Sequence, residues 1–193
     1  MIGFALAAAL SGAVVQGGEL LDVAADIPSG STSTGGGVEL VVAPDGKVTS
    51  CREIASVGGP EVAAAMCRRL DHARLRPAST SDGAAFGLVR LFMQQTPAAS
   101  GHELWRTGTR PEVELAVANI PVGMPTDQIV TTTLAVGADG NVVGCEAQPG
   151  IASPVGIAAC DAARTLRFEA VSGPGGSPVA FVSTTAVRFV LGN

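Results

Sequence analysis

Four cysteines, in two pairs of similar spacing, are the residues of this sequence with the clearest chemistry. Cys51 and Cys67 lie in the first half of the chain, and Cys145 and Cys160 occupy matching places in the second half. The matched spacing predicts one disulfide within each half, Cys51 with Cys67 and Cys145 with Cys160. Four buried free thiols are the alternative, and a metal site shared by all four would need closer spacings. The disulfide interpretation requires an oxidising compartment.

The sequence offers few candidate residues for catalysis. His72 and His102 are the only histidines, and neither recurs in the other half. The motifs G-x-S-x-G and H-E-x-x-H and a phosphate-cradling glycine loop do not occur in it. Asp45 and Asp139 do recur, but each precedes a glycine, and turn geometry accounts for that pattern. We therefore predict a non-enzymatic protein without catalytic residues, metal ligands or a cofactor.

The cysteines belong to a longer internal repeat. The segment that begins at Val38 reads VELVVAPDGKVTSC, and a similar segment that begins at Thr131 reads TTTLAVGADGNVVGC. Similarity also extends upstream, where the two copies share an Ile-Pro-x-Gly. The repeat predicts two homologous modules, at 18–93 and 111–193, joined by a linker at 94–110.

Each copy has the pattern of two strands, a helix and a closing strand. An Asp-Gly pair separates two runs rich in β-branched residues, which predicts a β-hairpin. Pro60 and Pro154 each open an alanine-rich run, which predicts a helix. Closing strands are expected within 86–93 and 179–191. The predicted fold class is α+β with two tandem β-β-α-β modules, and the glycine-rich Ser31–Gly37 is expected to be a flexible loop.

Charge and the amino-terminal segment narrow the cellular setting. The net charge is −5 and Lys47 is the one lysine, which argues against a nucleic-acid partner or an anionic membrane surface. The segment Ile2–Val15 is apolar and uncharged, too short to span a membrane but suited to the core of a signal peptide. Small residues predict cleavage after Ala13, within a leader at 1–17. Because no lysine or arginine precedes the apolar run, either the leader is atypical or the start is late.

Together these signals resemble the C-terminal domain of TonB-type energy transducers. The shared features are a turn Asp-Gly-x-Val-x-x-Cys, a proline at the helix start, a second cysteine in an alanine-rich helix, and a closing strand that alternates toward Val-Arg-Phe. Leu75–Ala78 reads Leu-Arg-Pro-Ala, where the family usually has Phe-Arg-Pro-Ala. The second copy departs from this pattern, with Glu169 and Ala170 in place of Arg-Pro. The resemblance covers about 38–93 and 131–193.

The resemblance implies that each module is a three-stranded antiparallel sheet with one helix packed on it. It also implies the periplasm of a Gram-negative bacterium, and outer-membrane receptors whose extended segments add as strands to the edge of the sheet. The closing strands are the expected edges. The expected peptide-binding residues are therefore Val89, Leu91, Val182, Thr184, Ala186 and Arg188.

The leading functional hypothesis is a periplasmic, non-enzymatic protein-binding module, accessory to TonB-dependent transport across the outer membrane. Its expected partners are outer-membrane receptor segments or other envelope proteins, bound by strand addition. No nucleic-acid partner is expected, and no lipid membrane partner beyond export. The alternative is an envelope structural or inhibitor-like spacer protein without a transport role.

Peptide mapping of the exported protein without reductant tests the cysteine pairing. Because each half carries its own pair, we expect peptides that join Cys51 to Cys67 and Cys145 to Cys160. Each closure of about 15 residues contributes on the order of 3 kcal/mol to stability in the chain-entropy model. A linkage between the halves, or free thiols in the exported protein, would contradict the prediction.

Overall fold

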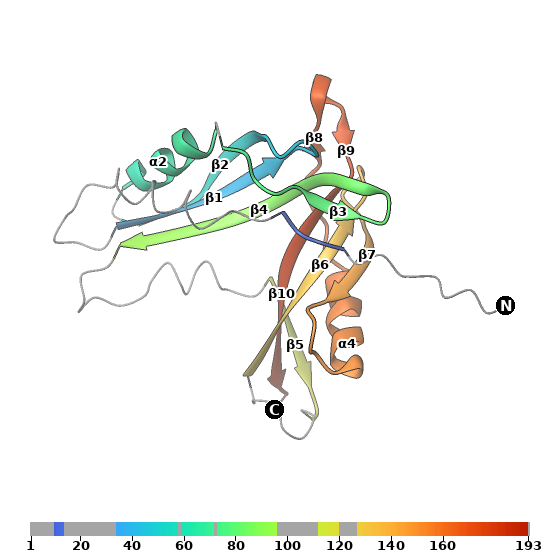
Figure 1. Cartoon of the computed structure of the whole chain (residues 1–193). Coiled ribbons are helices and arrows are strands. Elements are labelled where there is room, and N and C mark those ends of the chain that lie inside the picture. The colour runs from blue at the N-terminus through green and yellow to red at the C-terminus, as the bar shows by residue number, and fades with distance from the viewer. Residues whose placement is uncertain are drawn as a thin grey trace.

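The computed structural model describes residues 10–13, 34–57, 59–71, 73–95, 112–119 and 127–192. The first copy of the repeat forms β1 (Thr34–Val42), β2 (Val48–Val57), α2 (Glu61–Leu70), β3 (Ala78–Thr80) and β4 (Gly83–Gln95). The second copy forms β5 (Val113–Val117), β6 (Asp127–Val136), β7 (Val142–Ala147), α4 (Ser153–Ala163), β8 (Val171–Ser172), the short 3-10 helix η1 (Pro174–Gly176), β9 (Pro178–Val179) and β10 (Phe181–Leu191) (Figure 1). None of the helices in these residues is long and apolar enough to cross a membrane.

The two copies share one sheet, which shows that the prediction of two separate three-stranded modules is wrong. The described strands form an eight-stranded mixed sheet whose path runs β2-β1-β4-β10-β6-β7, with β3 added on β4 and β5 added on β10. The closing strands of the two copies, β4 and β10, pair in parallel through Phe86–Leu88 and Phe181–Ser183. A closing strand at the edge of a lone module would leave a row of backbone groups unpaired. Here each copy supplies a partner for the other.

The parallel pairing turns the second copy over relative to the first. Side chains alternate between the two faces of a strand. On β4, Val89 packs in the core cluster beneath α2, whereas its neighbour Leu88 belongs to the cluster beneath α4. The two helices therefore lie on opposite faces of the sheet, each at its own end (Figure 1). Each half thus has one face with a helix and one face without.

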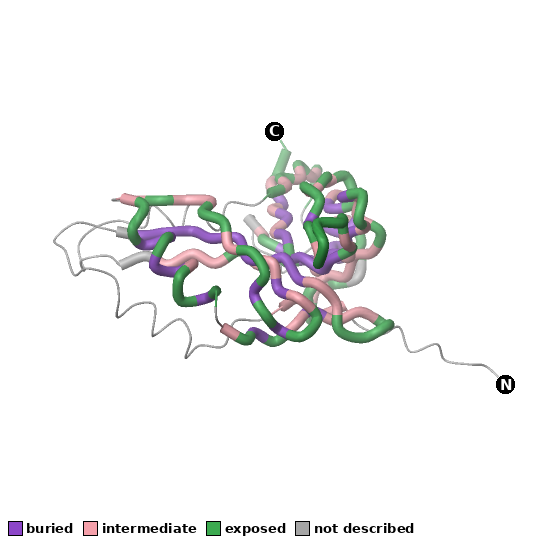
Figure 2. Tube along the Cα trace, turned by 90° about the horizontal axis from the view of Figure 1, so that it is seen from above, coloured by how far each residue is buried: buried purple, intermediate pink, exposed green. Residues whose placement is uncertain are grey.

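Each half has its own core of apolar side chains. Leu40 of β1 and Met66 of α2 are fully buried in the first core, and Leu134 of β6 is fully buried in the second. Phe168 and Phe181 make an edge-to-face contact in the second core, with ring centroids 5.9 Å apart. Figure 2 shows buried chain in both halves rather than one central core. The shared sheet therefore joins two cores without merging them.

A disulfide joins the helix to the second hairpin strand in each half, which confirms the predicted pairing. Cys51 on β2 is bonded to Cys67 on α2, with Cα atoms 5.5 Å apart. Cys145 on β7 is bonded to Cys160 on α4, with Cα atoms 5.6 Å apart. Both separations are usual for disulfides. The covalent link holds each helix to its half of the sheet.

The glycine run predicted to be a loop is largely the start of β1. Gly35–Gly37 pair with both β2 and β4, while residues 31–33 lie outside the described residues. A Cβ built on Gly36 would lie 2.5 Å from the backbone nitrogen of Ala63 in α2. A Cβ built on Gly37 would lie 2.6 Å from the ring of Phe92. Glycine serves close packing here rather than flexibility.

The Asp-Gly turns dock onto the chain that follows each helix. Gly46 and Gly140 have φ angles of +86° and +78°, a conformation that favours glycine. Leu75 N donates a hydrogen bond to Gly46 O at 2.8 Å, and Phe168 N donates one to Gly140 O at 3.0 Å. The hairpin prediction is confirmed, and each turn has the further role of anchoring the segment after its helix.

Two glycine variants distinguish the stability lost through backbone strain from the stability lost when the turn can no longer dock. Gly150 also has a positive φ, +88°, but a Cβ built there would have no neighbour within 4 Å. A Cβ on Gly140 would collide with the carbonyl oxygen of Phe168. We expect Gly150→Ala to lower the free energy of unfolding by about 1 kcal/mol, and Gly140→Ala to lower it by at least about 1 kcal/mol more. Urea unfolding without reductant measures both, and equal losses would contradict the docking role.

Candidate functional site

A fork in the sheet opens a cleft between the two halves. The strand β10 pairs with β4 as far as Ser183, and β5 joins it from Val187 onward. Along the intervening Thr184–Ala186, β10 pairs with β6 on one side, and no described strand pairs with it on the other. Figure 1 shows β4 and β10 running apart beyond their short pairing. The fork thus turns a short length of strand backbone toward the cleft.

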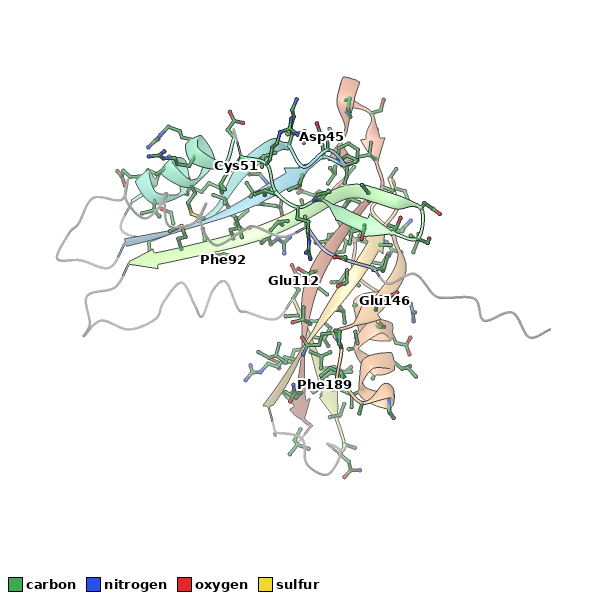
Figure 3. The ribbon with its side chains drawn as sticks, in the orientation of Figure 1. Asp45, Cys51, Phe92, Glu112, Glu146 and Phe189 are labelled. Carbon is green, nitrogen blue, oxygen red and sulfur yellow. A yellow bond between two sulfur atoms is a disulfide. The ribbon has the colours of Figure 1, made fainter. Side chains whose placement is uncertain are left out.

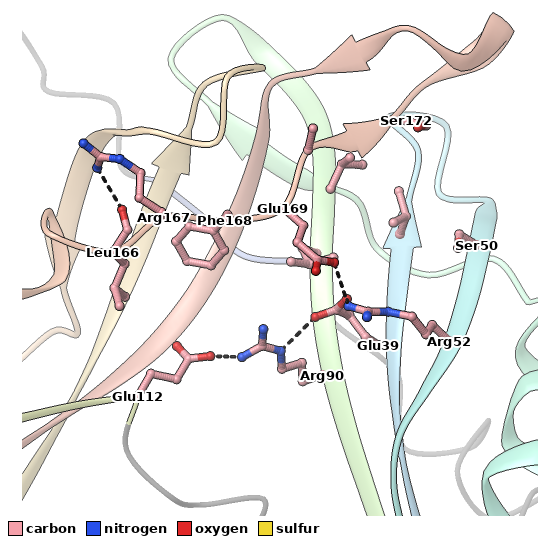
Figure 4. Close-up of a pocket in the computed structure, with 14 residues that line it drawn as sticks. Glu39, Ser50, Arg52, Arg90, Glu112, Leu166, Arg167, Phe168, Glu169 and Ser172 are labelled. Carbon is pink, nitrogen blue, oxygen red and sulfur yellow. Dashed lines mark hydrogen bonds and ion pairs between the residues drawn. The ribbon is translucent and has the colours of Figure 1, made fainter.

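The cleft contains two hollows that share a set of charged lining residues. The larger hollow has a volume of about 550 Å³ and is walled by residues 166–172, which follow α4 (Figure 4). The smaller has a volume of about 460 Å³ and reaches Phe92 and Thr184–Ala186. Volumes of this size accommodate a small ligand or a few residues of a peptide. The lining residues common to both hollows are Glu39, Arg52, Arg90 and Glu112.

A row of ion pairs crosses three neighbouring strands beside the cleft. Glu39 on β1 stands between Arg52 of β2 and Arg90 of β4, its partners in the strand register. The Glu39 carboxylate accepts hydrogen bonds from Arg52 Nη2 at 2.6 Å and from Arg90 Nε at 2.9 Å. The side chain of Glu39 is 10% exposed, against 57% for Arg52 and 40% for Arg90. The buried carboxylate therefore has a cation on each side, as a buried charge requires.

Two carboxylates of the second copy complete this network. Arg90 Nη1 pairs with Glu112, which precedes β5 and lies between the diverging strands (Figure 3). Arg52 Nη2 lies 3.4 Å from Glu169 Oε2 (Figure 4). The side chain of Glu169 is 86% exposed, so solvent screens this pair and its contribution is small. The network links the two copies, and Glu169 is its most loosely held member.

Opposing effects set the pKa of Glu39. Burial raises the pKa of its carboxyl group, but the hydrogen bonds and positive charges of Arg52 and Arg90 outweigh burial and hold the pKa below its ordinary value. The hydrogen bond with Glu39 in turn raises the pKa of Arg52. At neutral pH the carboxylate is ionised and both guanidinium groups are charged. The cleft therefore offers charged donors beside strand backbone with which no described strand pairs, and both can bind an extended chain.

The strands predicted to be edges have a neighbour on both sides over part of their length, and the peptide-binding role expected of their residues stays a prediction. The strand β4 lies between β1 and β10, and β10 lies between β4 and β6. Val89 and Leu91 pack against the core beneath α2. Val182 is 1% exposed. These side chains contribute to the packing of the fold. Beyond Leu88, β4 pairs with β1 alone among the described strands, so no described strand pairs with its other side at Val89 and Leu91.

The other predicted residues lie nearer the fork. Thr184 and Ala186 line the smaller hollow of the cleft. Arg188 lies farther along β10, where Nη1 is 3.4 Å from Glu114 Oε2 on β5. The four cysteines do not line the cleft. His72 and His102 lie outside the described residues, within which no group of three or more metal-ligating side chains is found.

The sequence analysis missed the charged row, although one signal for it was present. Glu39 is the single charged residue in the apolar strand sequence VELVV, where it alternates with Val38 and Leu40. That alternation indicates a side chain on the face opposite the helix. Its partners Arg52 and Arg90 are 13 and 51 residues away, so their approach depends on strand register.

The chain matches no protein-family model, and no curated protein and no solved structure matches it significantly. The resemblance to TonB-type transducers therefore stays a prediction from the residues. The geometry of the cleft is the stronger basis for a functional proposal.

Acid unfolding of Glu39→Gln tests the charged row. Because the folded-state pKa of Glu39 is lowered, its contribution is fully present above the ordinary value of 4.5 and is lost as pH falls through the folded-state pKa. At pH 7 we expect Glu39→Gln to lower the free energy of unfolding by about 1–2 kcal/mol, with the difference from wild type shrinking below about pH 4. Glu53→Gln, on the exposed Glu53 of β2, is the matched control and should show little loss. A difference that does not change with pH would contradict the ionised pairing of Glu39.

Proposed function

We propose that this protein is an exported, non-enzymatic protein-binding module that captures an extended peptide segment in the cleft at the fork. The observation that carries the proposal is the stretch Thr184–Ala186, whose backbone has no described strand partner on the cleft side. Strand backbone that is open beside a cleft is suited to strand addition, in which main-chain hydrogen bonds supply affinity. Neighbouring side chains then supply selectivity.

The side chains around this backbone suit an extended chain. Arg52 and Arg90 present partly exposed guanidinium groups, and Glu112 presents a carboxylate. Phe92 adds an apolar surface to the lining of the smaller hollow. A peptide can therefore find charged and apolar contacts within a few residues of each other. This mixture favours recognition of a defined segment over attraction by charge alone.

The cellular setting of the proposal rests on two kinds of support. The two disulfides are typical of proteins from oxidising compartments, which supports export. The periplasm of a Gram-negative bacterium, and a role accessory to TonB-dependent transport across the outer membrane, rest on the family resemblance alone. On that basis the first peptides to test are receptor segments that face the periplasm.

A blocked cleft tests the proposal directly. Peptides are selected from a phage-displayed library that also carries receptor segments, and the selected peptides are titrated by fluorescence anisotropy. Ser50 on β2 lines the larger hollow, so Ser50→Trp should fill it and weaken binding about tenfold or more. Thr49→Trp, on the exposed neighbour that does not line the cleft, is the matched control and should bind as wild type does.

Two outcomes would overturn the proposal. Peptides that bind Ser50→Trp as tightly as wild type use another surface. If the library and the receptor segments yield no binder, the protein does not capture extended peptides and the envelope spacer is favoured. Circular dichroism of each variant confirms that a loss of binding is not a loss of fold.

A further inference from the structure

Before the predicted cleavage after Ala13, the chain holds an extended segment of its own, Leu10–Ala13, against the helix-free face of the second half. Leu10 N donates a hydrogen bond at 2.9 Å to the Oε2 atom of Glu146. Glu146 lies on β7 (Figure 3). Ser11 exchanges two backbone hydrogen bonds with Ser79 on β3, at 3.1 Å and 2.9 Å. Ala13 packs against the core beneath α2. The segment Leu10–Ala13 therefore crosses from the second half of the sheet to the first.

Small residues on both sides allow this close approach. A Cβ built on Gly12 would lie 3.1 Å from the methyl group of Thr184 on β10. A Cβ built on Gly87 of β4 would lie 2.6 Å from the Cβ of Ala13. The segment is thus held by main-chain hydrogen bonds, and the narrow space around it admits only small side chains. Both are features of a groove for extended chains.

Because the second copy is turned over, the helix-free face of the first half is the counterpart of this groove. The register identifies matching positions: Leu40 pairs with Cys51 and Val89, just as Leu134 pairs with Cys145 and Ser183. The short hairpins match in the same way, since β3 pairs with the start of β4 and β8 pairs with β9. Each residue that touches Leu10–Ala13 therefore has a counterpart in the other copy.

Four of these counterparts lie together in the larger hollow of the cleft. A Cβ built on Gly144 of β7 would lie 3.8 Å from Leu10 Cδ1, so Gly144 also faces the segment. The correspondence places Ser50 at Gly144, Arg52 at Glu146, Arg90 at Thr184 and Ser172 at Ser79. Ser50, Arg52, Arg90 and Ser172 all line the hollow of about 550 Å³ (Figure 4). The lining residues of the cleft therefore occupy positions equivalent to those that contact Leu10–Ala13 in the second half.

Ser172 presents its backbone as Ser79 does. It stands opposite Pro178 in the pair of β8 with β9, and the next residue, Gly173, donates its N–H to Ser177 O at 2.9 Å. In an antiparallel pair, that bond directs the N–H and C=O of Ser172 away from β9. Ser172 can therefore exchange two backbone hydrogen bonds with an incoming chain, as Ser79 does with Ser11.

We infer that the larger hollow binds an extended segment of small residues in the pose of Leu10–Ala13, paired with the backbone of Ser172. The inference rests on the proposed function and adds the class of ligand and its direction. It also adds a charge, because Arg52 replaces Glu146. Glu146 accepts a hydrogen bond from the segment, whereas Arg52 donates, so the ligand carries a carboxylate at the position of Leu10.

The surroundings of Arg52 and Phe181 refine this ligand. Glu169 already places a carboxylate 3.4 Å from Arg52 and is highly exposed, so a ligand carboxylate can take its place. At the position of Gly87 the second copy has Phe181, which leaves less space at the end where Ala13 lies in the first groove. The expected ligand is therefore an acidic residue followed by two small residues, such as Glu-Ser-Gly.

Labelled peptides Ala-Ala-Glu-Ser-Gly-Gly, and versions with Gln or Lys in place of Glu, test the inference on the full chain. We expect the Glu peptide to bind tightest. Glu169→Gln removes the competing carboxylate from an exposed position, so it should tighten binding of the Glu peptide about twofold to fivefold without tightening that of the Lys peptide. A gain of affinity cannot result from misfolding.

A proline scan tests the main-chain contact. Ser172→Pro removes one backbone donor and should weaken the Glu peptide about fivefold. Ser177→Pro, in the same hairpin at a φ of −75° that suits proline, is the matched control and should leave affinity unchanged.

The outcomes separate this inference from the proposed function. Library peptides that bind wild type but not Ser50→Trp support the proposed function. If the Glu peptide is then not preferred, or does not respond to Glu169→Gln and Ser172→Pro, the inferred pose is wrong while the proposed function of the cleft is retained. If no library peptide binds, both proposals fail.

Discussion

The parallel pairing of β4 with β10 is the contact on which the rest of the structure depends. It extends over only three residue pairs, yet it joins the two copies into one sheet and turns one copy over. Because the closing strands run in the same direction, the two helices lie on opposite faces and each half keeps one face free of a helix. Those two faces are where the chain has a groove and a cleft.

The helix-free face of the first half, which forms the cleft, carries the buried charge of Glu39. A carboxylate as buried as that of Glu39 loses much of its hydration, and only good pairing compensates for that loss. Arg52 and Arg90 provide it from the two neighbouring strands, and their own exposed ends stay available to the cleft. The second copy has Thr133 in the place of Glu39, Glu146 in the place of Arg52 and Thr184 in the place of Arg90, so the two faces differ in charge. Duplicated architecture with divergent side chains gives two grooves of different chemistry.

Local signals predicted local structure well. The Asp-Gly turns, the prolines at the helix starts and the matched cysteines each act within a few residues of themselves, and the hairpins, helices and disulfides agree with the structure. The pairing of β4 with β10 could not be predicted this way, because an alternating apolar strand has the same sequence pattern at an edge as in the interior. The cleft depends on that pairing, so its residues were missed too. Gly35–Gly37 show the same limit, since close packing overrode a composition typical of loops.

The pairing of β4 with β10, called the seam below, joins residues far apart in the sequence, and this affects how the chain folds. Ser183 Oγ donates to Leu88 O across β4 and β10, and these residues are 95 positions apart. Closing so long a loop costs more entropy than closing a hairpin, and non-local pairings form slowly. The hairpin and helix of each half can therefore form before the seam does, and the cleft exists only once the seam has formed. The cleft is lined by residues of both halves, so neither half alone presents the whole binding surface. A partner bound in the cleft therefore stabilises the pairing of the two halves rather than either half by itself.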